Sequence, residues 1–189
     1  MNKLLRLIIF FTLFNSAEIC AQSKLGNEWI TGRGAKIEFI NNNIITKYNV
    51  LINTHYFHKG HSNICDTNGN LILCSDGYNV YNSNAMYIDN GDTLVPNDYY
   101  SVHDGFSILP QTSIFLPIDS NMYYFVSPAM GNARYADCLA NNHCFFDLLL
   151  YNVIDMNANA GAGKVVKRMQ PLMTNAELSK SQMMACRHS

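Results

Sequence analysis

Three histidines at regular spacing are the residues whose types best suit metal chemistry. His55, His58 and His61 form an H-x-x-H-x-x-H run, and imidazole is the commonest metal ligand in proteins. Their neighbours are typical of strand and loop, where successive side chains alternate, so His55 and His58 would point to opposite faces. The run also lacks the H-E-x-x-H pattern that places a glutamate as general base. The three histidines are therefore weak candidates for a metal site, and no cofactor is expected.

Two glycine-bearing segments contain the residue types of ion-binding and phosphate-binding loops. Residues 66–70, DTNGN, begin like a calcium loop, but the glycine comes too early and no acidic residue closes the loop. Residues 161–164, GAGK, lack the four-residue gap between glycines and the following Ser or Thr of a phosphate-binding loop. Both segments are interpreted as turns, and the second leads into Val165 and Val166.

The chain contains residue types that occur in catalytic sites, but no recognisable catalytic motif. His103 and Asp104 accompany many serines, yet no G-x-S-x-G elbow is present. Glu28, Glu38 and Glu177 show no paired-carboxylate pattern of the kind that glycoside hydrolysis needs. We therefore expect a protein that is not an enzyme, while residues that meet only in space escape this reasoning.

The elements that carry these residues are organised around residues 62–82, SNICDTNGNLILCSDGYNVYN. Asn68-Gly69 lies between two short apolar runs, and Asp76-Gly77 follows the second run. Both dipeptides accept the positive φ that a tight two-residue type I′ turn requires. The stretch therefore predicts three antiparallel strands in meander order.

Two cysteines fall on the first predicted hairpin. Around a two-residue turn, Cys65 lies opposite Ile72 and Cys74 lies opposite Asn63, so the cysteines are diagonal neighbours. Diagonal β-carbons are about 7 Å apart, whereas a disulfide needs about 4 Å. We expect Cys65 and Cys74 to be buried free thiols that pack as small apolar residues.

Two further cysteines bracket a loop-like segment at residues 139–143. A local disulfide between Cys138 and Cys144 would stabilise this loop by about 2 kcal/mol on the chain-entropy model. Two free thiols, or a pairing with Cys186, are the alternatives.

Period-2 alternation and turn residues recur along the chain, and no segment has a convincing 3.6-residue period. The one helical candidate is residues 175–184, where Thr174 could cap a helix. Further strands are predicted at residues 28–31, 35–39, 44–52, 78–81, 106–109, 112–116, 122–127 and 145–154. The sequence therefore predicts an all-β protein.

The same residues carry a resemblance to a known family. The matching positions in the central stretch are Ile64, Asp66, Thr67, Asn68, Gly69, Asn70, Leu71, Ser75, Asp76 and Gly77. Trp29 with Gly32, Gly34, Ala35 and Phe39, then residues 111–117, Tyr123-Tyr124 and residues 151–156, follow in the expected order. The chain resembles secreted WD40-like β-propeller proteins from Gram-negative bacteria with a type IX secretion system. It departs from the family at Cys65, Cys74 and the loop at residues 129–143.

This resemblance implies β-propeller-like blades of antiparallel meander strands, with Trp29 filling a gap between blades. Blades take about 40 to 45 residues each, so residues 22–189 would hold two to three blades of an incomplete propeller, the amino-terminal part of a longer one. Its open sheet edges would be templates for association. The implied function is a non-enzymatic binding or scaffold module for an unknown protein or glycan at the cell surface, including adhesion. A propeller-class glycan-cleaving hydrolase or lyase, and a periplasmic metal-binding protein, are the alternatives.

The first 21 residues have the pattern of a secretory signal peptide. Lys3 and Arg6 precede an apolar run at residues 7–13, and small residues end at Ala21. The run is shorter than the roughly 20 residues of a membrane-spanning helix, although a membrane anchor is the alternative. We predict cleavage after Ala21, export to the periplasm, the outer cell surface or the medium, and no transmembrane segment afterwards.

Composition limits the partners. The formal net charge is -1 and only 14% of residues are charged, with no basic run. Such a chain has no electrostatic footprint for nucleic acid or for an anionic membrane surface.

Overall fold

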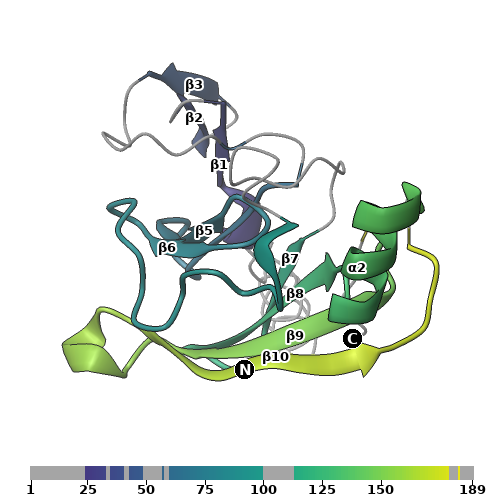
Figure 1. Ribbon diagram of the computed structural model, residues 1–189. Coiled ribbons are helices and arrows are strands. Elements are labelled where there is room, and N and C mark those ends of the chain that lie inside the picture. The colour runs from purple at the N-terminus through teal and green to yellow at the C-terminus, as the bar shows by residue number, and fades with distance from the viewer. Residues whose placement is uncertain are drawn as a thin grey trace, which may run out of the picture.

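The computed structural model describes residues 24–32, 35–40, 43–48, 57, 60–99, 113–178 and 183. The predicted signal peptide, His55, His58 and the strand predicted at residues 106–109 lie outside the described residues. Three antiparallel sheets and one α-helix make up the described part (Figure 1). The prediction of an all-β protein is therefore confirmed, while no closed propeller is formed by these residues.

The first sheet consists of the strands β1 (Glu28–Thr31), β2 (Ala35–Ile40) and β3 (Asn43–Lys47), after a short 3-10 turn, η1 (Lys24–Gly26). We call it the β1–β3 sheet. Glu28 on β1, Glu38 on β2 and Ile45 on β3 lie side by side across it. This sheet projects from the rest of the molecule at the top of Figure 1.

The second sheet is the meander predicted from residues 62–82. Its strands β4 (Ser62–Cys65), β5 (Leu71–Ser75) and β6 (Val80–Asn82) pair antiparallel in chain order. We call it the β4–β6 sheet. It supports the β1–β3 sheet, because the backbone N–H of Ile30 donates to the Asn63 side chain and Asn63 donates back to the carbonyl of Glu28.

The third sheet has four strands in the order β10-β9-β8-β7. These are β7 (Ile114–Pro117), β8 (Met122–Ala129), β9 (Leu148–Asp155) and β10 (Lys164–Met173), and a 3-10 turn, η3 (Asn159–Gly161), lies between the last two. Residues 161–164 complete the β9–β10 hairpin, as predicted, because Lys164 pairs with Asp155. We call this the β7–β10 sheet.

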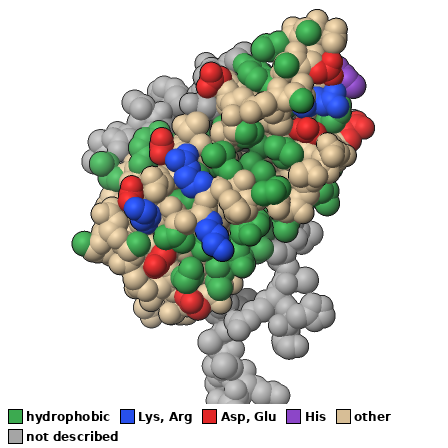
Figure 2. Space-filling model, turned by 60° about the horizontal axis from the view of Figure 1, so that its bottom comes forward, with side chains coloured by type: hydrophobic (Ala, Val, Ile, Leu, Met, Phe, Trp, Pro, Cys, Tyr) green, Lys and Arg blue, Asp and Glu red, His purple; other side chains and the backbone are tan. Residues whose placement is uncertain are grey.

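The main core lies between the β4–β6 and β7–β10 sheets. Strands of the two sheets and the segment after β6 bury apolar side chains that belong to one cluster: Ile64, Leu73, Val80, Ile88, Leu94, Phe115, Tyr123, Phe125, Ile154 and Val165. On the side where β10 lies, Val166, Leu172 and Met173 stay exposed. Figure 2 shows hydrophobic side chains gathered on that side of the molecule, with Lys and Arg side chains among them.

A helix, α2 (Asn132–Asn141), stands where no helix was predicted and takes in part of the segment expected to be a loop. Only Cys138 of its ten residues is buried, although Tyr135, Cys138 and Leu139 recur at helical spacing. Asn142 ends the helix in the left-handed conformation at φ 55°, and its N–H donates to the carbonyl of Cys138.

The first hairpin turn is longer than the two-residue turn predicted at Asn68-Gly69. Gly69 N–H donates to the carbonyl of Asp66, so Thr67 and Asn68 are the central residues and Gly69 follows them at φ 95°. The Asp66 carboxylate causes this geometry, because it accepts from the backbone N–H of Asn68 and of Asn70 at 2.8 and 2.9 Å. Burial alone would raise the pKa of Asp66, but these donors hold it below 3.8.

The longer turn changes the register by one residue. Cys74 lies opposite Asn63, as predicted, but Cys65 lies opposite Leu71 and not Ile72. The bulge falls between Ile64 and Cys65. Both cysteines are nevertheless buried free thiols.

The second turn is also longer than predicted, because Asp76 is a buried acceptor. Its carboxylate receives the backbone N–H groups of Tyr78 and Asn79, and the Tyr81 hydroxyl donates to it at 2.6 Å. Burial raises the pKa of Asp76, while these donors act in the opposite direction. Ser75 pairs with Val80, so four residues connect β5 to β6, and Gly77 takes φ 105° among them.

Candidate binding cleft

An open cleft of about 900 Å³ lies between the β1–β3 sheet and the turn that joins β4 to β5. The sheet contributes two carboxylates, an ammonium group and apolar side chains, and the turn contributes amides. The residues that line the cleft include Asn27, Glu28, Glu38, Phe39, Ile44 and Asn68. The predicted turn residues Asn68 and Gly69 thus border this cleft, whereas Asp76 and Gly77 are in a turn that does not line it.

Four charged side chains join the three strands along one face of the β1–β3 sheet. The Lys36 ammonium lies 2.9 Å from a Glu28 oxygen and 2.6 Å from a Glu38 oxygen. The second Glu38 oxygen lies 2.7 Å from the ammonium of Lys47. We call these four residues the ion network. Because Glu28, Lys36 and Glu38 are mostly buried, little water screens their charges.

The network shifts the pKa values of its members. Hydrogen bonds from Lys36 and then Lys47 hold the pKa of Glu38 below 4.5, against the opposing effect of burial. Burial alone would lower the pKa of the Lys36 ammonium, but its hydrogen bonds to Glu38 and Glu28 and their charges leave that pKa above 10.5. Glu38 is therefore an ionised acceptor near neutral pH and cannot serve as an acid there.

An asparagine forms the contact between the two walls of the cleft. Asn27 accepts the N–H of Phe39 through its backbone carbonyl at 2.8 Å. Its side chain lies against Gly69, where a β-carbon would come within 2.7 Å of the Asn27 amide nitrogen. Gly69 is thus required both by its positive φ and by this close approach.

The aromatic side chains of this sheet lie on the face opposite the ion network. Trp29 and Phe39 meet edge to face, with ring centroids 5.1 Å apart. Trp29 is 53% exposed, so the expectation that it fills a gap between blades is wrong. Strand alternation explains this, because β1 turns Ile30 into the core and Trp29 to the other side.

The predicted metal site is only partly described. His61 directly precedes β4, whereas His55 and His58 lie outside the described residues, so the H-x-x-H-x-x-H hypothesis stays a prediction. Within the described ranges, no group of three or more His, Cys, Asp or Glu side chains could hold a metal ion. In the same part of the chain, no helix has the length and apolar character to cross a membrane.

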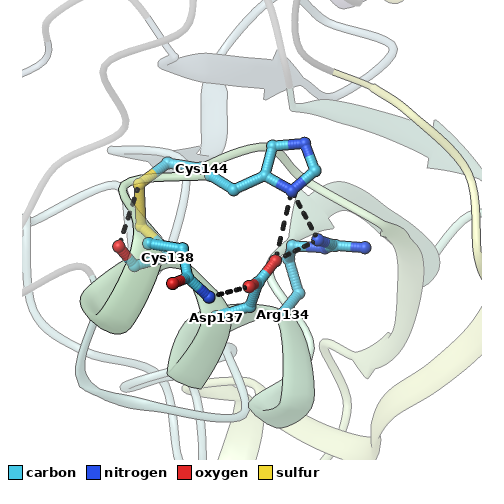
Figure 3. Close-up of a disulfide and its surroundings, with 6 residues drawn as sticks. Arg134, Asp137, Cys138 and Cys144 are labelled. Carbon is cyan, nitrogen blue, oxygen red and sulfur yellow. Dashed lines mark hydrogen bonds and ion pairs between the residues drawn. A yellow bond between two sulfur atoms is a disulfide. The ribbon is translucent and has the colours of Figure 1, made fainter.

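A disulfide lies outside this cleft. Cys138 and Cys144 are bonded, which links the end of α2 to the segment before β9 (Figure 3). Beside the bond, Asp137 accepts from Arg134 at 2.6 Å and lies 3.2 Å from His143. The Arg134 guanidinium also stacks 4.0 Å above the ring of Phe145. Arg134 is thus held between Asp137 and Phe145, beside the disulfide.

On the sequence alone, Glu28 and Glu38 were treated as separate acids, and Lys36 and Lys47 were assigned no role. Lys36 and Glu38 are two residues apart on one strand, which places them on one face. That spacing was a usable signal, but the pairing with Glu28 and Lys47 depends on sheet register. Comparison with known proteins found no matching family model, no matching curated protein and no matching solved structure.

Proposed function

We propose that the protein is an exported, non-enzymatic binding module of β-propeller type, and that its cleft binds a glycan or protein at the cell surface. One observation carries this proposal: an open cleft combines a charge-balanced ion network, exposed amides and apolar side chains. The four-stranded meander of the β7–β10 sheet, packed on the β4–β6 sheet, supports the propeller-type assembly.

The lining favours a glycan. Sugar hydroxyls both donate and accept hydrogen bonds, and Asn68, Lys47 and the Glu28 carboxylate supply both kinds of partner at the cleft. Ile40, two residues from Glu38 on β2 and so on the same face, supplies apolar surface for the C–H face of a sugar ring. The network's balanced charge favours a neutral ligand over a strongly acidic or basic one.

The same cleft argues against glycan cleavage with Glu38 as the acid. Glu28 and Glu38 share one ammonium group, so their carboxylates are close enough to suggest a catalytic pair. Glycoside hydrolysis, however, needs one carboxylic acid whose pKa is raised. The pKa of Glu38 is lowered, and Lys36 occupies the space where a glycosidic oxygen would approach that carboxylate.

The proposal is tested by screening the purified protein against immobilised polysaccharides and an oligosaccharide array. We expect Asn68→Ala to weaken the strongest signal about tenfold, since one or two hydrogen bonds are lost. Asn121→Ala is the matched control: Asn121 is exposed in the equivalent Asp119-Ser120-Asn121 turn, and its N–H bonds Asp119 as that of Asn68 bonds Asp66. If both variants bind equally well, the ligand does not bind in the cleft.

Turnover is measured on the same preparation with chromogenic glycosides. We expect none. Hydrolysis that disappears in Glu38→Gln, with the fold unchanged, would replace the binding module by the hydrolase. Equilibrium dialysis against zinc and copper tests the metal-binding alternative, which bound metal lost with His61→Ala would support.

A further inference from the structure

The strand β3 is an exposed edge of the β1–β3 sheet. Among the described residues, β2 is the only strand hydrogen-bonded to it. All five residues of β3 are exposed, including Ile44 at 70% and Ile45 at 39%. The edge therefore presents backbone groups and β-branched side chains together.

Soluble proteins usually protect such an edge with charges, proline, a bulge or a covering segment. The sequence of β3, NIITK, has a single charge at its end and no proline, and its pairing with β2 runs without a bulge. Lys47, its one charge, is already paired with Glu38. A strand with this composition is suited to pair with another strand.

We propose that β3 pairs antiparallel with β3 of a second copy of this chain, about a two-fold axis at Ile45. In this register Ile45 faces Ile45, and Ile44 faces Thr46 of the second copy. Lys47 then faces Asn43, so no like charges are opposed. The sequence of the strand is thus complementary to itself, which is the requirement of an isologous interface.

The faces of the two sheets also match in this register. The row Trp29, Ile37, Thr46 of one copy continues into Ile44 and Phe39 of the other, so a row that is apolar except for Thr46 runs across the interface. On the opposite face, Ile45 separates Glu38 of one copy from Glu38 of the other. A slip by one residue would place the ion network of one copy beside the apolar face of the other.

The interface is small, because a five-residue strand is only about 17 Å long. The area that this interface buries is smaller than that of a permanent dimer, so association is reversible and depends on concentration. It does not depend on any ligand of the cleft, and its failure would leave the proposed function untouched.

Single cysteine substitutions test the register directly. Directly opposite residues have β-carbons about 5 Å apart, so Ile45→Cys is expected to give about ten times more covalent dimer under mild oxidation than Ile44→Cys or Thr46→Cys alone. Mixing Ile44→Cys with Thr46→Cys should restore cross-linking. The parent protein, oxidised in parallel, gives the background from its own thiols, which include Cys186 and the buried Cys65 and Cys74. Equal yields from the three single variants, or no dimer from a folded Ile45→Cys protein, would overturn the proposal.

Analytical ultracentrifugation of the protein without an added cysteine provides the second measurement, which is how much dimer forms at each concentration. Ile45→Lys would oppose two ammonium groups at the axis and abolish the concentration-dependent dimer. Ile118→Lys changes a residue of similar exposure outside β3 and should leave the dimer intact. Self-association that both variants retain, or a parent protein that is monomeric at every concentration, would contradict pairing through β3.

Discussion

In the β1–β3 sheet a network of charges joins the strands, whereas apolar side chains join the β4–β6 sheet to the β7–β10 sheet. Glu38 is 5% exposed within the first region, and Phe125 is fully buried within the second. The first region also leaves Trp29 and Ile44 in solvent. Burial of apolar surface is the dominant favourable term in folding, so the two packed sheets supply most of the stability.

The two regions therefore have separate roles. The packed sheets hold the fold, and the β1–β3 sheet presents polar and apolar groups at a cleft and at an edge. Ile30 and Asn63 are among the contacts that attach the β1–β3 sheet to the β4–β6 sheet. Changes in the core should therefore affect the whole molecule, and changes in the ion network should act mainly on the β1–β3 sheet.

The largest effect is expected from Phe125→Ala in the core. Phe125 contacts Phe115 with ring centroids 5.0 Å apart, and its loss leaves a cavity that should cost about 4 kcal/mol. Urea unfolding followed by far-UV circular dichroism measures the free energy of unfolding. Tyr124→Ala, at the neighbouring and 39% exposed position, is the control and should cost about 1 kcal/mol. Equal costs would mean that the core has been assigned wrongly.

The next largest effect is expected from Lys36→Ala in the ion network. Removing the shared ammonium leaves two mostly buried carboxylates side by side, which should cost about 3 kcal/mol. Fluorescence of Trp29, the only tryptophan, reports the local change. Lys167→Ala removes an exposed lysine from the edge strand β10. It should change unfolding neither by fluorescence nor by circular dichroism. A loss seen equally by fluorescence and by circular dichroism would show that the two regions unfold as one.

A smaller effect is expected from removing the disulfide at α2. Replacing Cys138 and Cys144 by serine opens a short loop, which should cost about 2 kcal/mol on the chain-entropy model. Reduction of the parent protein should give the same loss, while the double variant should not respond to reductant. Peptide mapping without reduction checks the bond itself, and a link from Cys138 to any other cysteine would contradict the structure.

Strand positions were predictable wherever alternation and turn residues agreed. β1 was predicted with its observed bounds, and β8 began at the predicted residue, because period-2 patterns and flanking Asn, Asp and Gly both pointed to strands. The lengths of the two turns were not predictable in this way. The Asp66 and Asp76 carboxylates bond backbone N–H groups several residues ahead, and this competes with the two-residue turn that Asn-Gly and Asp-Gly favour.

The helix and the cleft escaped sequence reasoning for different reasons. α2 has only ten residues and buries only Cys138, so the helical spacing of Tyr135, Cys138 and Leu139 was too short a signal to be recognised. The cleft depends on which residues of β1, β2 and β3 lie opposite one another, and no local pattern specifies that register. Gly69 was identified from its turn signal, but its contact with Asn27 joins segments more than 40 residues apart in the sequence, and only the structure reveals it.

The central claim is that an ion network stabilises the β1–β3 sheet separately from the apolar core, and acid unfolding tests it most directly. The pKa of Glu38 lies below its ordinary 4.5 in the folded protein, so its stabilising contribution is present above that pH and is lost as the pH falls through the folded value. Urea midpoints are measured by Trp29 fluorescence and by circular dichroism from about pH 6 to about pH 3. We predict a lower midpoint for fluorescence, with a gap that widens below pH 4.5. Midpoints that coincide at every pH would contradict the account.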